Sequence, residues 1–256
     1  MTRRLVPLWL LLAATGGLLA TGRLEAAPSG APEIGTARVA YNDTIESAEY
    51  ANGVDLVASY SVVDDQLTGA SPVDPTHDEL WSTVTDTVPE PWRTRIRQFS
   101  VVQQGAAGTV AMVHQSGIDP DRWLLSVDIA DADNGRLLVD TLVHELVHLV
   151  TLRPEEFTFE HRLSGDCDGV TVAVGCAHPG SVVARWADAF WTDPSQSTPF
   201  DPESFVAPYA ATGPHEDLAE TFLYWTRGDR PEAGSVLAAK FAFIDTEPDL
   251  ATLATG

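Results

Sequence analysis

The sequence predicts an α+β fold, in which a small mixed sheet packs on one long apolar helix and a mostly helical part follows. Three features support this prediction. Short β-rich runs cluster between residues 96 and 129, a helical pattern covers residues 135–152, and further helical patterns occur among Gly-, Pro- and Asp-rich turns after residue 154. The long helix contains the pattern His-Glu-x-x-His at residues 144–148, which the rest of the fold must accommodate.

Residues 1–26 are predicted to be a signal peptide. Arg3 and Arg4 precede a short apolar run that ends in small residues, and we expect cleavage near Ala26. No other stretch approaches the roughly 20 apolar residues that span a bilayer. We therefore expect a secreted protein with no membrane segment in its mature form. An uncleaved signal anchor is the alternative, although a Gly-Gly pair interrupts the apolar run.

The chain is strongly acidic, with a formal net charge of -22 at pH 7. Such a surface repels phosphate backbones and anionic membranes, so we expect neither a nucleic-acid partner nor a membrane partner. About 230 residues remain after residue 26, which suits one domain or two lobes around a full hydrophobic core. We further expect a monomer.

Residues 27–76 are predicted to form an N-terminal extension. They mix Gly, Pro, Ser and Asp with β-rich runs at residues 37–41 and 54–63. A mobile start, a propeptide and extra strands all fit this pattern, and the choice among them stays open. The main domain is placed at residues 77–256.

One helix and three strands are predicted ahead of the long helix. Residues 77–88 have helical spacing through Leu80, Trp81 and Val84, and Pro89 ends the helix. Three β-like runs follow, separated by Gly-rich or Asp-Pro turns, at residues 96–102, 108–114 and 123–129.

The long helix is expected at about residues 135–152. Asp131, Asp133 and Asn134 offer N-cap oxygens ahead of it, and an Arg-Pro pair stops it. The two aspartates, together with Asp128, form an alternative calcium site, although the glycine does not fall where an EF-hand loop needs it.

The His-Glu-x-x-His pattern places His144 and His148 on one face of this helix, about one turn apart, with Glu145 beside them. The helix is apolar over most of its circumference, so we expect it to be buried. Burying two imidazoles and a carboxylate without partners would be costly, and a dication would supply the missing partner. The alternative is an amphipathic helix with two incidental histidines.

Cys167 and Cys176 are predicted to form a disulfide, because they close a short loop in a chain that we expect to be exported. Two reduced thiols are the alternative, and their spacing is not that of a zinc knuckle. A further helix is expected at residues 181–191. Four aromatic residues nearby belong to the core or line a cleft wall: Trp186, Phe190, Trp191 and Phe200.

A second acidic helix is predicted to begin near Gly213. With Gly213 as N-cap and Pro214 at the first position, Glu216 and Glu220 lie one turn apart on the same face. A carboxylate at the third position stabilises a helix by about 0.3–1 kcal/mol without any metal, which is the simpler account of Glu216. That account leaves Glu220 unexplained. A catalytic zinc needs a third protein ligand, and no histidine occurs six residues after His148, so Glu216 is the candidate.

The two patterns together resemble the gluzincin clan of zinc metallopeptidases, and in particular its lethal-factor-like and related secreted bacterial branches. The resemblance rests on His-Glu-x-x-His and on Glu-Asp-Leu-Ala-Glu-Thr-Phe at residues 216–222, and it covers about residues 140–230 well. It implies a zincin-like fold with an N-terminal lobe at residues 77–153 and a C-terminal lobe at residues 154–256. The long segment at residues 154–213 departs from the short members of the clan and leaves specificity open.

The resemblance implies a role for each site residue. His144, His148 and Glu216 would bind one catalytic Zn²⁺, and Glu145 would act as general base on the zinc-activated water.

Two further roles have more than one candidate. The oxyanion would be held by Tyr209, which occupies the place of the family's tyrosine two turns before the third ligand, or by His215 or His161. The acid one turn after the third ligand, Glu220, would orient a ligand histidine as in the family. Asp140, one turn before the first histidine, is the other candidate for that role, or it faces solvent.

We therefore expect a secreted zinc metallopeptidase that hydrolyses peptide bonds in a protein or peptide substrate. The alternative is a non-catalytic binding domain in which zinc stabilises a zincin scaffold, and Glu145 argues against it because a structural site needs no base. A hydrolase with a nucleophilic Ser or Cys is a third possibility, but no Gly-x-Ser-x-Gly elbow is present.

Overall fold

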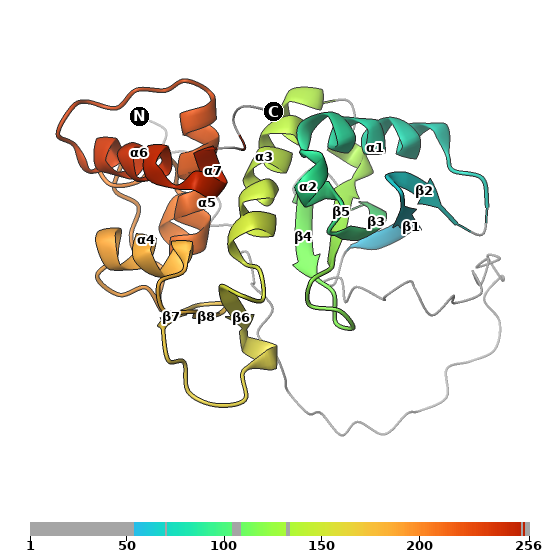
Figure 1. Cartoon of the computed structure of the whole chain (residues 1–256). Coiled ribbons are helices and arrows are strands. Elements are labelled where there is room, and N and C mark those ends of the chain that lie inside the picture. The colour runs from blue at the N-terminus through green and yellow to red at the C-terminus, as the bar shows by residue number, and fades with distance from the viewer. Residues whose placement is uncertain (1–53, 70, 104–108, 132–133, 252, 254–256) are drawn as a thin grey trace, which may run out of the picture. The chain divides into compact units, whose positions relative to one another are not determined.

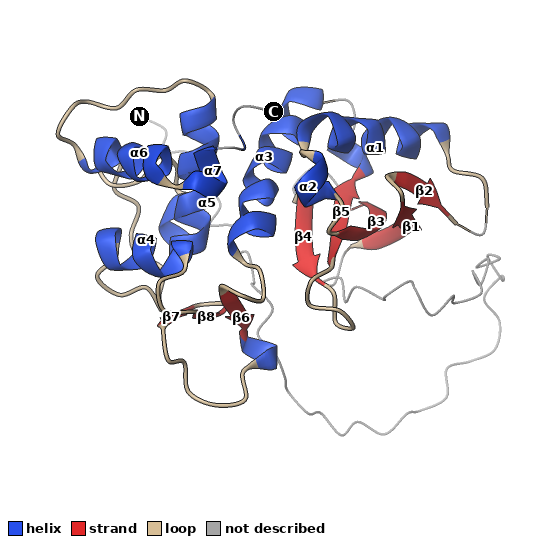
Figure 2. Ribbon diagram, in the orientation of Figure 1, coloured by secondary structure: helices blue, strands red, loops and turns tan. Residues whose placement is uncertain are grey.

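The computed structural model shows a mixture of helices and strands, which confirms the α+β class (Figure 2). The predicted signal peptide and the β-rich run at residues 37–41 lie outside the described residues. The described residues are 54–69, 71–103, 109–131, 134–251 and 253.

A five-stranded mixed sheet is the main β structure (Figure 1). Its strand order is β2-β1-β3-β5-β4, in which β3 and β5 are parallel and the other neighbouring pairs are antiparallel. The three strands predicted between residues 96 and 129 are confirmed, with small shifts at their ends. The strands are β1 (Asp55–Val63), β2 (Gln66–Thr68), β3 (Ile96–Gln103), β4 (Ala111–Gln115) and β5 (Trp123–Asp128).

β1 and β2 form a hairpin that belongs to this sheet, because β1 pairs with both β2 and β3. The turn passes through Asp64 and Asp65 at φ values of 49° and 61°, a left-handed region that the short polar side chain of Asp tolerates. Residues 55–68 thus add two strands to the sheet, and whether residues 27–76 are a propeptide stays a prediction. The domain boundary at residue 77 stays a prediction, and the sheet itself begins before it.

α1 (Pro75–Thr87) confirms the helix predicted at residues 77–88 and begins slightly earlier. Asp74 caps it, since Asp74 Oδ1 accepts a hydrogen bond from the backbone N–H of Thr76 at 2.9 Å. The ring of Trp81 packs against that of Phe99 in β3, with centroids 5.4 Å apart, so α1 covers one face of the sheet. The short helix α2 (Glu90–Arg93) follows.

α3 (Gly135–Thr151) is the long helix that contains the His-Glu-x-x-His pattern. Asn134 caps it, with its Oδ1 accepting a hydrogen bond from the backbone N–H of Leu137 at 3.3 Å. α3 contacts β4, α1 and α2, and it also contacts α5 further along the chain. Its predicted burial is confirmed, because its apolar residues belong to the core: Leu138, Leu142, Leu146, Val147, Leu149 and Val150.

The acids ahead of α3 are described only in part. Asp128 is buried, and its Oδ1 accepts the backbone N–H of Ala130 at 2.9 Å. The side chains of Asp131 and Asp133 lie outside the described residues. The calcium alternative therefore stays a prediction.

A second, three-stranded antiparallel sheet follows α3, in the order β6-β8-β7. Its strands are β6 (Phe157–Phe159), β7 (Val170–Val172) and β8 (Gly175–Ala177). The predicted disulfide between Cys167 and Cys176 is present beside it. Gly175 has φ 157°, and a Cβ there would lie 2.2 Å from the carbonyl oxygen of Thr158, so the sheet requires glycine. The sequence did not predict this sheet, because three-residue strands are too short to show alternation.

The C-terminal part is mostly helical, as predicted, and α5 contacts α3, α4 and α6. Of the four aromatic residues considered above, Trp186 lies in the core, Phe190 and Trp191 are half-buried and Phe200 is exposed. Within the described residues, no helix has the length and apolar content that crossing a bilayer requires. The helices are α4 (Val182–Phe190), α5 (Pro214–Thr226), α6 (Val236–Thr246) and α7 (Pro248–Ala251).

Candidate metal site

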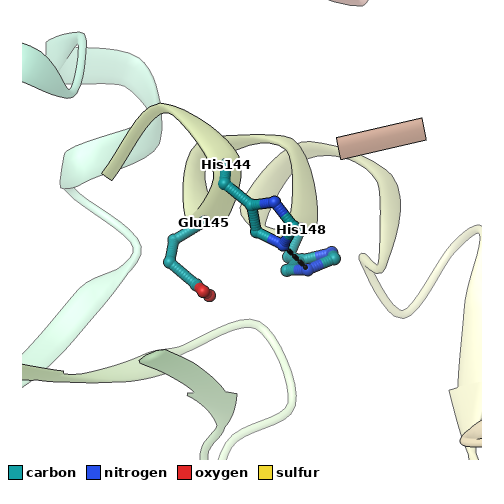
Figure 3. A group of neighbouring side chains, drawn as sticks. All are labelled: His144, Glu145 and His148. Atoms are coloured by element: carbon teal, nitrogen blue, oxygen red, sulfur yellow. Dashed lines mark hydrogen bonds between the residues drawn. The ribbon is translucent and has the colours of Figure 1, made fainter. Parts of the chain in front are cut away.

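Two histidines of α3 place their rings together. His144 and His148 lie one turn apart, their Nε2 atoms are 3.1 Å apart, and their side chains are only 7% and 8% exposed. Figure 3 shows the two rings in contact and Glu145 next to them on the same helix. The donor atoms of His144, Glu145 and His148 lie within 4.8 Å of one another, so this group could hold a metal ion.

α5 brings a carboxylate to the same place. Glu216 Oε2 lies 2.9 Å from His144 Nε2 and 3.3 Å from His148 Nε2. The three atoms therefore form a triangle with sides of 2.9, 3.1 and 3.3 Å. Contact between α3 and α5 makes the triangle possible, although Glu216 follows His148 by 68 residues in the chain.

Hydrogen bonds alone do not satisfy this triangle. Three contacts need three bridging hydrogens, but an ionised carboxylate carries none and each Nε2 carries at most one. In addition, His144 Nδ1 lies 2.9 Å from Glu220 Oε1, so a His144 that gives up its second proton to make room for a metal can still donate to Glu220 and turn a bare Nε2 towards Glu216 and His148. A cation among the three atoms would satisfy all of them at once.

Glu220, and not Asp140, faces the second nitrogen of His144. Asp140 instead binds Arg227 at the end of α5, with Arg227 Nη2 donating to Oδ2 at 2.6 Å and Nε donating to Oδ1 at 3.4 Å. The alternative that Asp140 orients His144 is therefore wrong, because a guanidinium already occupies that carboxylate. His148 differs from His144, since its buried Nδ1 has no hydrogen-bond partner in the described part of the chain.

Glu145 lies beside the triangle and is held by the main sheet. Its Oε2 accepts a hydrogen bond from the backbone N–H of Val113 in β4 at 3.0 Å. Burial raises the pKa of Glu145. The sequence could not indicate Val113, because a backbone donor has no side-chain signature.

The carboxylates around the two imidazoles favour positive charge. Burial alone would lower the pKa of His144, but its hydrogen bonds with Glu216 and Glu220 raise that pKa to about 10. Burial alone would raise the pKa of Glu216, yet the imidazoles of His148 and His144 hold it well below its ordinary value. The electric field that favours a proton on His144 equally favours a bound cation.

Tyr209 lies next to the histidines. It begins a 3-10 turn (Tyr209–Thr212) ahead of α5, and its ring centroid is 5.7 Å from that of His144. The residue is 36% exposed, yet its partial removal from water and the neighbouring carboxylate of Glu216 raise the pKa of Tyr209, so its hydroxyl keeps its proton and remains a donor. A protonated phenol therefore lies beside His144.

The other two candidates for the oxyanion role differ from Tyr209. His215 is buried, its Nε2 lies 3.4 Å from Glu216 Oε1, and burial lowers its pKa to about 4. A neutral His215 therefore faces Oε1 of Glu216, whereas Oε2 forms the triangle with the two histidines. The sequence did not suggest this contact of His215. The side chain of His161 lies outside the described residues.

Two hollows of about 330 and 600 Å³ lie elsewhere on the described surface, and none of the site residues lines either of them. The smaller one is lined by half-buried aromatic residues, including Trp191, and by the polar loop that follows α4. The candidate site is therefore defined by its converging donor atoms and not by these hollows.

Comparison with protein-family models, with curated proteins and with solved structures found no match for the chain. What the protein does is therefore inferred from its side-chain geometry. That geometry brings together two histidines and three glutamates from two helices that are far apart in the sequence.

Proposed function

We propose that the protein is a secreted zinc metallopeptidase with a zincin-like fold, in which His144, His148 and Glu216 bind one Zn²⁺. The observation that supports this most strongly is the triangle of donor atoms, with sides of 2.9, 3.1 and 3.3 Å. Bonds of about 2.0–2.2 Å in tetrahedral geometry put zinc ligands about 3.3–3.6 Å apart, a few tenths of an ångström longer than these sides, so small shifts of the side chains would admit the ion. Two imidazoles and one carboxylate are also a donor set of catalytic zinc, which leaves a fourth position for water.

Glu145 is the proposed general base. When bound, zinc acts as a Lewis acid that makes water acidic near neutral pH and polarises a carbonyl group. Val113 holds Glu145 through Oε2, which leaves Oε1 to take the proton from the attacking water and return it to the leaving amine. The pKa of Glu145, which burial raises, makes this carboxylate a stronger base than an exposed glutamate.

Tyr209 is the proposed donor to the oxyanion that forms on the substrate carbonyl. Its protonated hydroxyl and its place beside His144 support this role. His215 is the second candidate for this role; its Nε2 lies 3.4 Å from Glu216 Oε1.

A peptide is the substrate that the surroundings support best. β4 is the terminal strand in the order of the described sheet, and Val113 in β4 is the residue that binds Glu145. An extended peptide that pairs with a terminal strand satisfies its backbone groups and lies along it. A peptide on β4 would thus bring a scissile amide towards the general base.

Secretion and a monomeric state are part of the same proposal. The disulfide Cys167–Cys176 supports export, since such bonds persist in oxidising compartments. The charge of -22 argues against nucleic-acid partners for the same reason as before.

The test is the variant Glu145→Gln. It should retain one equivalent of zinc, measured by elemental analysis of the purified protein, because Glu145 is not a ligand in this proposal. Its kcat on a peptide library should fall by about 10²–10⁴-fold, the usual contribution of a positioned base. Glu79→Gln, an identical change on the exposed face of α1, is the matched control and should leave zinc and activity unchanged.

The outcomes separate the possible functions. Full activity of Glu145→Gln would exclude the mechanism. A wild-type protein that binds zinc but cleaves no peptide in the library would favour the non-catalytic binding domain. A wild-type protein that contains no zinc, takes up none when zinc is added and cleaves no peptide would exclude both the metallopeptidase and the zinc-stabilised binding domain.

A further inference from the structure

A buried ion pair lies directly behind the candidate metal site. Lys240 Nζ in α6 donates hydrogen bonds to Asp217 Oδ2 at 2.7 Å and to Oδ1 at 2.8 Å. The two side chains are 1% and 0% exposed, and Lys240 is the only lysine in the chain. Removing two charges from water is costly unless hydrogen bonds satisfy their remaining groups.

Asp217 has further donors from two helices. Trp186 Nε1 in α4 and Trp191 Nε1 at its end donate to Asp217 Oδ2 at 2.9 and 3.0 Å. Thr221, one turn later in α5, donates to Oδ1 at 3.4 Å. Together with Lys240, these donors hold the first turn of α5 against α4 and α6.

Asp217 follows Glu216 directly in the chain. Successive residues of an α-helix point about 100° apart around its axis, so the two carboxylates face different sides of α5. Glu216 points at the imidazoles of α3, whereas Asp217 points into the core of the C-terminal part. Holding Asp217 therefore limits rotation of α5 about its axis, and that rotation decides how far Glu216 Oε2 lies from the two histidines.

Lys240 also contacts the segment that leads to Tyr209. Its Nζ donates to the carbonyl oxygen of Ser204 at 2.7 Å and lies 4.3 Å from the ring centroid of Phe205. The same segment is attached to the 3-10 turn of Tyr209, because the backbone N–H of Thr198 donates to the carbonyl oxygen of Ala211 at 2.9 Å. One ammonium group thus contacts both the helix of the third ligand and the loop ahead of the phenol.

We propose that Asp217 and Lys240 are positioning residues, which set Glu216 and Tyr209 at the right distance from the imidazoles of α3. Neither residue touches the substrate or the metal. The inference rests on the proposed zinc site and adds to it the part of the fold that keeps the site assembled.

The test is the double variant Lys240→Met with Asp217→Asn. The asparagine keeps an acceptor for the two indole N–H groups, and no charge is left buried without a partner. The zinc dissociation constant, measured by competition with a chelator, should rise by about 10-fold or more, as expected when groups that orient a ligand are lost. The kcat should fall more than KM changes, because Tyr209 shifts with its loop.

The matched control is the double variant Arg185→Met with Glu247→Gln. It removes another ion pair, Arg185 Nη2 to Glu247 Oε2 at 2.6 Å, which joins α4 to the end of α6; within the described residues neither side chain hydrogen-bonds to α5. It should lower the melting temperature and leave the zinc dissociation constant within about twofold, so a general loss of stability is distinguished from loss of positioning.

A milder variant covers the case in which the double variant does not fold. Trp191→Phe removes one donor to Asp217 and keeps the ion pair, and it should weaken zinc binding by about 2–5-fold. Equal zinc affinity in wild type and in a folded variant, whether the double variant Lys240→Met with Asp217→Asn or Trp191→Phe, would overturn the inference while leaving the proposed zinc site intact.

A wild type that binds no zinc would instead refute the proposed function. The inference is then decided on the metal-free protein from the NMR signals of the His144 and His148 rings. If these signals move in the double variant Lys240→Met with Asp217→Asn but not in the Arg185→Met with Glu247→Gln control, the result supports positioning of Glu216. Unmoved signals in both variants overturn the inference.

Discussion

His144 is held through both of its ring nitrogens, one facing Glu216 and the other facing Glu220. A carboxylate on Nδ1 fixes the tautomer and the plane of an imidazole and makes Nε2 a better donor to a metal. His148 has no such partner in the part of the chain that is described, so only one of the two histidines depends on this support.

The variant Glu220→Gln should therefore weaken zinc binding without abolishing it. Loss of the charge on Nδ1 should raise the zinc dissociation constant by about 10–100-fold, the usual cost of removing such a partner. Chelator competition on the purified variant measures the change. Asp140→Asn, one turn from His144 but bound to Arg227, is the control and should change zinc affinity little. A larger loss in Asp140→Asn than in Glu220→Gln would contradict the assignment.

At the scale of single residues, most of the site could be predicted from helical spacing. His144, His148, Glu216 and Glu220 lie at i and i+4 on two helices, and that spacing is visible in the sequence. The backbone N–H of Val113 could not be predicted, because its contact with Glu145 exists only after the sheet and α3 have packed.

The start of α5 is the element on which the geometry of Glu216 depends. Gly213 is its N-cap, with φ 178°, an extended conformation open to any residue. The restriction is steric, since a Cβ on Gly213 would lie 3.0 Å from Cε1 and 3.2 Å from Nδ1 of His215. His215 in turn faces Glu216, so a displaced ring would disturb the proposed third zinc ligand.

Gly213→Ala should consequently lower both stability and zinc affinity. Overpacking of this kind costs about 1–3 kcal/mol, which chemical denaturation of the metal-free protein would measure. Gly135→Ala, at the first position of α3, is the control: a Cβ there meets nothing within 4 Å, so we expect no loss of stability. Equal behaviour of the two variants would show that the space beside His215 does not matter.

Three helices with capping side chains were predicted well, whereas α6, which Ser235 caps, and the second sheet were not. Asp74, Asn134 and Ser181 accept hydrogen bonds from the first turns of α1, α3 and α4, and the predicted helices begin close to them. The second sheet was missed because its strands are three residues long and depend on pairing across a disulfide-closed loop.

At the scale of the whole chain, the class of fold could be predicted from the residues themselves, whereas the meeting of α3 and α5 was expected only from the two patterns taken together and their family resemblance. The sequence shows two helices that each carry part of a donor set, and nothing local says that residues 72 positions apart will touch. The contact depends on α4 and α6, which pack against α5 and hold its first turn through Asp217. Such packing is a property of the assembled core.

The burial of Lys240 has a practical consequence for handling the molecule. Because the chain has no other lysine and this one is 1% exposed, an amine-reactive dye should modify the folded protein at its α-amino group alone. Mass spectrometry of tryptic fragments should find a second label at residue 240 only after denaturant opens the helices around it, whereas rapid native labelling there would contradict the buried pair. A fluorophore can thus be attached at the α-amino group alone. The slow labelling of Lys240 then reports how often the helices that bury it, α4, α5 and α6, separate from one another.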